Sequence, residues 1–95
     1  MHHIVARTAP RAEAARKILV ERCNLGVEIP ENKVSLKSGL HNRLHRKKYY
    51  TMVNKRLKSA YYGKQCSHKQ RVKRVKNALL EIKSYLLGLN AVAPF

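Results

Sequence analysis

Residues 32–80 carry fifteen lysines and arginines and no aspartate or glutamate. All five acidic residues of the 95-residue chain are glutamates outside that stretch, and the formal net charge is +16. A compact fold with so little internal compensation repels itself, and such a surface binds polyanions, most often nucleic acid and sometimes anionic membrane. We therefore expect an external polyanion to neutralise this stretch, mainly through contacts with its phosphates.

The length and the cysteine content restrict the class of protein further. A chain this short buries little surface on its own, so a deep active-site pocket is not expected. Its apolar content of 44% still exceeds that of a disordered polyelectrolyte, so some segments should fold. Cys23 and Cys66 make a poor disulfide framework, which favours a reducing compartment. The apolar runs are only a few residues long, so the sequence predicts no membrane span.

A short helix is predicted near the amino terminus. Pro10 is followed by apolar and small residues at helical spacing, which indicates a helix over residues 10–23. Pro30 disfavours a helical conformation for the residue before it and marks a boundary. We therefore divide the chain into an N-terminal segment, residues 1–30, and a basic helical region, residues 31–95.

The first long helix is predicted directly after this boundary. Asn32 is a residue type that caps helices, and leucines and other apolar residues then recur every third or fourth position. Leu36, Leu40 and Leu44 begin this pattern, and the tyrosines and valines after them continue it. The sequence therefore predicts a helix over residues 33–62.

The second long helix has the clearest boundaries. Ser67 and Gln70 have the spacing of a capping box and precede a new apolar stripe. Gly88 follows the last residues of that stripe and suits a helix end, so the predicted helix covers residues 68–87. The predicted fold class is all-α: a short N-terminal helix followed by two long basic helices, packed as a hairpin or extended on RNA.

The polar faces of the two long helices supply the candidate RNA-binding residues. They are expected to contact phosphates and to recognise the shape of RNA more than its sequence. These residues are Lys47, Lys48, Lys55, Arg56, Lys58, Lys64, Lys69, Arg71, Lys73, Arg74 and Lys76.

The five tyrosines divide into two groups. Tyr49 and Tyr62 are candidates to stack on unpaired bases. Tyr50, Tyr61 and Tyr85 are expected to pack against the helices with their hydroxyls at the edge.

Metal binding and catalysis find little support in the residue pattern. The candidate zinc donors lack the paired spacing of a zinc site: Cys23, His41, His45, Cys66 and His68. General acid–base catalysis usually needs carboxylates or histidines positioned in a pocket, and Glu81 is the only acid after residue 31. We therefore expect no enzymatic activity, no metal, no cofactor and no small-molecule substrate.

A series of residues in the first half of the chain follows the order of a known family. The series is Ile4-Val5-Ala6-Arg7, Ala15, Cys23, Gly26, Lys47-Lys48-Tyr49-Tyr50 and Lys55-Arg56. Because these residues occur in this order, the chain resembles small-subunit ribosomal protein twenty-one of the bacterial and mitochondrial type. Thr51-Met52-Val53 departs from it, because that family has Glu-Lys-Pro there. The resemblance implies a structural constituent of the small ribosomal subunit that binds ribosomal RNA and neighbouring ribosomal proteins, with a mitochondrial ribosome favoured over a cytoplasmic one.

Three alternatives stay open. The run from Arg74 to Leu79 is similar to the ending of large-subunit ribosomal protein twenty-nine, which implies a two-helix protein near the exit tunnel. A DNA-binding or chromatin protein would also use a basic surface, and it should carry a recognisable reading helix. A membrane-surface protein would use the first basic helix.

Overall fold

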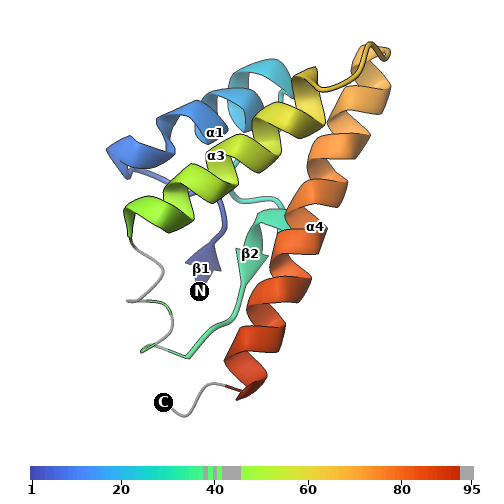
Figure 1. The fold of residues 1–95 in the computed structure, drawn as a ribbon. Helices are drawn as coiled ribbons and strands as arrows, with labels where there is room; N and C mark the ends of the chain where they lie inside the picture. Colours follow the sequence, from blue (N-terminus) through green and yellow to red (C-terminus); the bar gives the residue numbers. More distant parts are fainter. Residues whose placement is uncertain (38, 40, 42–45, 93–95) are drawn as a thin grey trace.

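The chain forms a mostly helical structure with one small antiparallel sheet (Figure 1). The structure is a computed structural model and describes residues 1–37, 39, 41 and 46–92. The all-α prediction is correct in its helical content and wrong in omitting the sheet. In chain order the elements are β1 (His2–His3), a 3₁₀ turn (Pro10–Ala12), α1 (Glu13–Lys17), a π-helical turn (Ile18–Arg22), a second 3₁₀ turn (Pro30–Asn32), β2 (Lys33–Val34), α3 (Lys47–Tyr62) and α4 (His68–Val92).

The N-terminal helical segment confirms the prediction for residues 10–23. Its three consecutive turns begin at Pro10, whose fixed backbone suits the first position of a helix. The segment ends at Asn24, which adopts the left-handed conformation with a φ of 53°. The backbone N–H of Leu25 then donates to the carbonyl of Leu19 at 3.0 Å and satisfies one of the last helical carbonyls.

The sheet joins the start of the chain to the segment after Pro30. His2 lies opposite Val34, and His3 lies opposite Lys33, in an antiparallel register. Two strands of two residues are too short to be stable alone, so helices and buried side chains must hold them in place. The sheet therefore depends on its packing more than on its own hydrogen bonds.

The predicted helix over residues 33–62 begins far later than expected. Residues 33–34 are extended and paired with β1, which excludes a helical backbone there. The helix starts at Lys47, and Leu36 packs against the core from outside any helix. Leu40 and Leu44, which supported the early start, lie outside the described residues. The helical spacing that begins at Leu36 thus does not extend a helical backbone to residues 33–34.

Helix α4 begins as predicted and ends later. The Ser67 N–H donates to Gln70 Oε1 at 3.3 Å, and the Gln70 N–H donates to Ser67 Oγ at 3.2 Å, so the capping box is confirmed. Gly88 does not end the helix, which continues to Val92. Leu89 packs against the core, and this contact extends the apolar stripe beyond the glycine.

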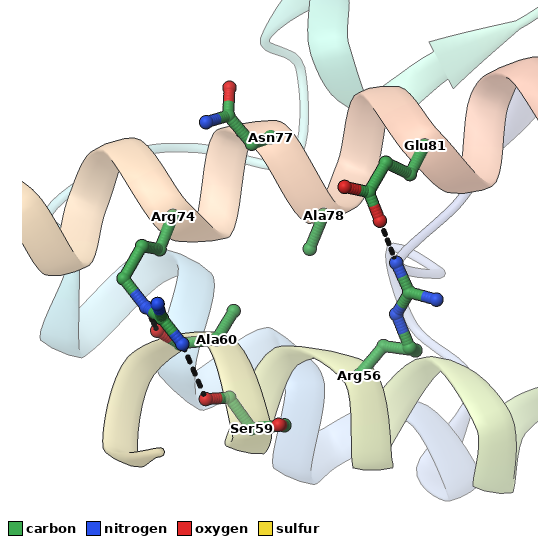
Figure 2. Close-up of a pocket in the computed structure, with 7 residues that line it drawn as sticks. All are labelled: Arg56, Ser59, Ala60, Arg74, Asn77, Ala78 and Glu81. Carbon is green, nitrogen blue, oxygen red and sulfur yellow. Dashed lines mark hydrogen bonds and ion pairs between the residues drawn. The ribbon is translucent and has the colours of Figure 1, made fainter. Parts of the chain in front are cut away.

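Arginine side chains join α3 and α4. Figure 2 shows Arg56 of α3 paired with Glu81 of α4. It also shows Arg74 of α4 reaching the end of α3, where its guanidinium donates to the carbonyls of Ala60 at 2.8 Å and Ser59 at 3.4 Å. The carbonyl of Ala60 belongs to the last turn of α3, where helical N–H donors run out, whereas the carbonyl of Ser59 also accepts the N–H of Gly63 at 2.9 Å. Arg74 therefore caps α3 from the neighbouring helix.

One hydrophobic core connects both ends of the chain. It contains residues from both the N-terminal segment and the basic helical region. Across the part of the chain that the structure describes, no helix combines the length and apolar character needed to cross a membrane. The largest of the fully buried apolar side chains are Ile4, Val5, Leu19, Val34, Val53, Leu57, Val75, Leu79 and Leu86.

The side chain of Asn32 forms hydrogen bonds that hold the segment just after β1 against the rest of the fold. It is fully buried, and its Oδ1 accepts the Val5 N–H at 2.7 Å. Its Nδ2 donates to the carbonyls of Val5 at 3.1 Å and Val27 at 2.8 Å. The sequence suggested that Asn32 caps a helix, but its amide instead replaces missing sheet hydrogen bonds. Without it, buried backbone groups would lose their partners.

Replacing Leu79 with alanine should destabilise the fold by about 2–5 kcal/mol, because the side chain is fully buried in α4 and its loss leaves a cavity. Leu80 is the matched control, since it lies on the same helix and is 46% exposed. Leu80→Ala should change the free energy of unfolding by about 0.5 kcal/mol or less. Urea unfolding followed by circular dichroism measures both. Equal costs for the two variants would contradict this core.

Replacing Asn32 with alanine should cost about 2–4 kcal/mol, because it leaves the N–H and carbonyl of Val5 buried and unpaired. Asn77→Ala on the exposed face of α4 serves as the control and should be nearly neutral. Thermal or urea unfolding of the two variants checks this. A stable Asn32→Ala protein would show that the amide is dispensable.

Candidate active site

His2 is a buried histidine held by a tyrosine and a second histidine. Its ring is 2% exposed, and its Nε2 lies 2.7 Å from the hydroxyl of Tyr49 on α3. The Tyr49 hydroxyl also donates to the carbonyl of Ile4 at 3.0 Å. The Nδ1 of His2 lies 3.1 Å from the Nδ1 of His41. Side chains from a strand, from α3 and from His41 thus meet at one imidazole.

The contacts of Tyr49 determine which ring nitrogen of His2 carries the proton. A tyrosine hydroxyl has one hydrogen, and this one is donated to the carbonyl of Ile4. The hydroxyl oxygen must therefore accept from Nε2 of His2, which places the proton of a neutral imidazole on Nε2 and a lone pair on Nδ1. Burial, and then the neighbouring Tyr50, raise the pKa of Tyr49, so its hydroxyl stays protonated in this role.

His3 has its own carboxylate partner. Its Nε2 lies 2.8 Å from Oε1 of Glu28, and its side chain is only 17% exposed. A carboxylate only accepts, so Nε2 carries the hydrogen and Nδ1 of the neutral ring carries the lone pair. A carboxylate that fixes an imidazole through one ring nitrogen, with the lone pair on the other, is typical of an oriented general base.

Glu28 is surrounded by positive groups. Its carboxylate lies 3.2 Å from Nζ of Lys33 and 3.4 Å from Nε of Arg7, in addition to its contact with His3. The hydrogen bonds from His3 and Lys33 lower the pKa of Glu28 below its ordinary value. The carboxylate therefore stays ionised at neutral pH and can hold the His3 ring in one orientation.

Both histidines of β1 line one pocket. Neighbouring residues of a strand point to opposite sides, so His2 contacts α3 while His3 contacts Glu28. Even so, both rings border a cavity of about 380 Å³, together with His41 and Arg7. An oriented imidazole, two further imidazoles and a guanidinium thus share one pocket, which combines proton-accepting groups with a positive charge.

The arginines predicted to bind RNA make contacts within the chain. Arg56 pairs with Glu81, and Arg74 caps α3. Arg71 donates from Nε to the carbonyl of Cys66 at 3.2 Å and lies over the ring of Tyr61, 5.3 Å from its centre. Their role in RNA binding stays a prediction, and each of them has a structural role as well.

The predicted lysines lie on the surface, distributed over two helices and the link between them. Lys69, Lys73 and Lys76 of α4 line one surface groove, and Lys76 is partly buried there. The remaining predicted lysines are exposed: Lys47, Lys48, Lys55, Lys58 and Lys64. The structure thus places the lysines where a polyanion can reach them.

The tyrosines differ from the prediction at two positions. Tyr49 is buried and holds His2, so it does not offer a face for stacking. Tyr85 is 60% exposed and is not a packing residue. Tyr50 is buried as expected, and Tyr62 is exposed as expected.

The sequence interpretation missed the site because it sought acids late in the chain. The signals were present: two adjacent histidines in a short apolar strand, and a glutamate shortly before Pro30. The candidate zinc donors do not assemble: Cys23 is buried in the core and burial raises its pKa, while His68 contacts Tyr61. His45 lies outside the described residues. The residues that the structure describes contain no group of three or more His, Cys, Asp or Glu side chains placed to hold a metal ion.

Comparison with known families finds one match that covers most of the chain. Residues 1–86 match AHH, a nuclease family of the HNH/ENDO VII superfamily with conserved AHH. The one pair of adjacent histidines in this sequence is His2–His3, and the residue before it is Met1 and not alanine. A comparison with curated proteins and one with solved structures each found no match.

The match overturns the ribosomal interpretation. It covers nearly the whole chain, whereas the likeness to ribosomal protein twenty-one rested on about half of it and on common residue types. Four expectations therefore lose their basis. They are a structural role in the small subunit, binding to ribosomal RNA and ribosomal proteins, a location in the ribosome or the mitochondrion, and the alternative near the exit tunnel. The expectation of no enzymatic activity is also wrong, because the matching family is a family of nucleases. The chain belongs to the AHH family of nucleases, within the HNH/ENDO VII superfamily.

Proposed function

We propose that this protein hydrolyses phosphodiester bonds of nucleic acid, with His3 as the general base. The observation that carries the proposal is the pocket shared by His2, His3, His41 and Arg7, in which Glu28 orients His3. The family supports the reaction class, and the strongly basic surface supports the substrate class.

The proposed reaction is hydrolysis by a water molecule, with two proton transfers. Nδ1 of His3 takes a proton from a water molecule as the water oxygen attacks phosphorus. The bond between phosphorus and the leaving oxygen breaks, and the leaving oxygen takes a proton from solvent. Glu28 stabilises the imidazolium that forms on His3, because its carboxylate accepts the Nε2 hydrogen.

The remaining groups position the substrate. Arg7 borders the pocket and presents a guanidinium that suits a phosphate oxygen. Tyr49 is a positioning residue, because its hydroxyl holds the ring of His2. The paired Nδ1 atoms of His2 and His41 place two more imidazoles beside the scissile phosphate.

Many nucleases use a bound divalent cation to neutralise charge in the transition state. His2 and His41 bring two ring nitrogens together, which is fewer than the three protein ligands of a typical catalytic zinc site. The described residues do not complete such a site, and the proposed roles of His3 and Glu28 do not involve a metal. Cleavage of nucleic acid by this protein should be compared with and without added Mg²⁺.

Replacing His3 with glutamine should lower the cleavage rate by about 10²- to 10⁴-fold, because the general base is lost while a donor to Glu28 remains. Cleavage of fluorescent DNA and RNA oligonucleotides measures the rate. His68→Ala is the matched control, since His68 is exposed on α4 and lies outside the pocket. Wild-type rates for His3→Gln would refute the assigned base.

The lysine groove of α4, formed by Lys69, Lys73 and Lys76, should supply part of the salt-dependent affinity for nucleic acid. Changing all three to glutamine should reduce the slope of log K against log salt by about 0.9 per lost phosphate contact on duplex DNA. Binding is measured on the His3→Gln background so that the substrate stays intact. Lys17→Gln is the control, because Lys17 already pairs with Glu13 at 3.3 Å. An unchanged slope in the triple variant would exclude this groove as a phosphate contact.

A further inference from the structure

A second groove lies between α3 and α4, and Tyr49, whose hydroxyl contacts His2, is one of the residues that line it. The two helices approach each other at their linked ends and diverge toward the start of α3 and the end of α4 (Figure 1). A groove of about 460 Å³ lies between them. Its apolar lining includes Met52 of α3 and Ile82, Tyr85 and Leu89 of α4.

Tyr85 presents an aromatic ring to this groove. Its side chain is 60% exposed, whereas Tyr49 and Tyr50 are 8% and 7% exposed. Met52 and Leu89 are partly buried beside it and form an apolar surface of limited size. An exposed ring over such a surface is the usual platform for stacking a nucleobase, since every base has an apolar face.

The charges around the groove favour a nucleic-acid strand. Lys48 is exposed at the groove, and among the described residues no carboxylate forms an ion pair with it. Arg56 and Glu81 neutralise each other at the end of the groove that faces the pocket of Figure 2. The groove therefore offers an aromatic surface and one uncompensated cation, which match a base and its phosphate.

Tyr49 connects this groove to the active site. Its ring lines the groove, while its hydroxyl contacts His2 and the carbonyl of Ile4. We propose that the groove holds one base of the bound strand, stacked on Tyr85 with a phosphate on Lys48. This inference rests on the proposed nuclease function for the identity of the ligand. It adds a site for a single unpaired base next to the site of hydrolysis.

The test measures base stacking without cleavage. A single-stranded oligonucleotide carrying 2-aminopurine is titrated with the His3→Gln variant, and the fluorescence of the modified base is followed. Stacking on Tyr85 should quench the emission. Tyr85→Ala should abolish the quenching and weaken binding about 5- to 150-fold, the equivalent of about 1–3 kcal/mol for one stacked base. Tyr85→Phe keeps the ring and should keep the quenching.

Tyr62→Ala is the matched comparison, because Tyr62 is also an exposed tyrosine, at 53%, and lines a different groove with Lys58. Binding without quenching, or quenching lost in Tyr62→Ala and kept in Tyr85→Ala, would overturn the assignment. Binding of a free 2-aminopurine nucleotide as tight as that of the strand would also overturn it, since the occupant would then be a nucleotide. An inactive wild-type protein that still shows Tyr85-dependent quenching would refute the proposed hydrolysis and leave this binding site standing.

Discussion

The buried amide of Asn32 is the interaction on which the site depends. Strand β1 has two residues, and it cannot hold its histidines in place through sheet pairing alone. Asn32 supplies three further hydrogen bonds, two to Val5 and one to Val27, in an environment without competing water. The strand is therefore fixed at its end, and the positions of His2 and His3 follow from that.

Asn54 has a comparable role between the N-terminal helical segment and α3. Its Oδ1 accepts the N–H of Ala15 at 3.0 Å, and its Nδ2 donates to the carbonyl of Arg11 at 2.8 Å. Two asparagine amides thus connect segments that are far apart in the sequence, through bonds to backbone atoms. This suits a short chain, because each amide satisfies a donor and an acceptor at once.

The sequence predicts local helices well and the site poorly, for physical reasons. The capping box of Ser67 and Gln70 and the helical spacing after Pro10 are encoded by neighbouring residues, and both appear in the structure. The strand at Lys33 is fixed by pairing with His2 and His3, about thirty residues away, which no local pattern reveals. The pairing of His3 with Glu28 is equally remote. The net charge predicts a polyanionic partner, but charge does not separate a structural RNA binder from a nuclease.

The alternation of side chains along β1 has a consequence for how activity is lost. His2 faces Tyr49, and His3 faces Glu28, because successive residues leave a strand on opposite sides. A shift of one residue in the pairing with β2 would turn His3 toward Tyr49 and place Ile4, a core residue, beside Glu28. The helices could still form, but the imidazole beside Glu28 would be lost. The registration of a two-residue strand, in addition to the packing of the helices, thus decides whether His3 meets its carboxylate partner.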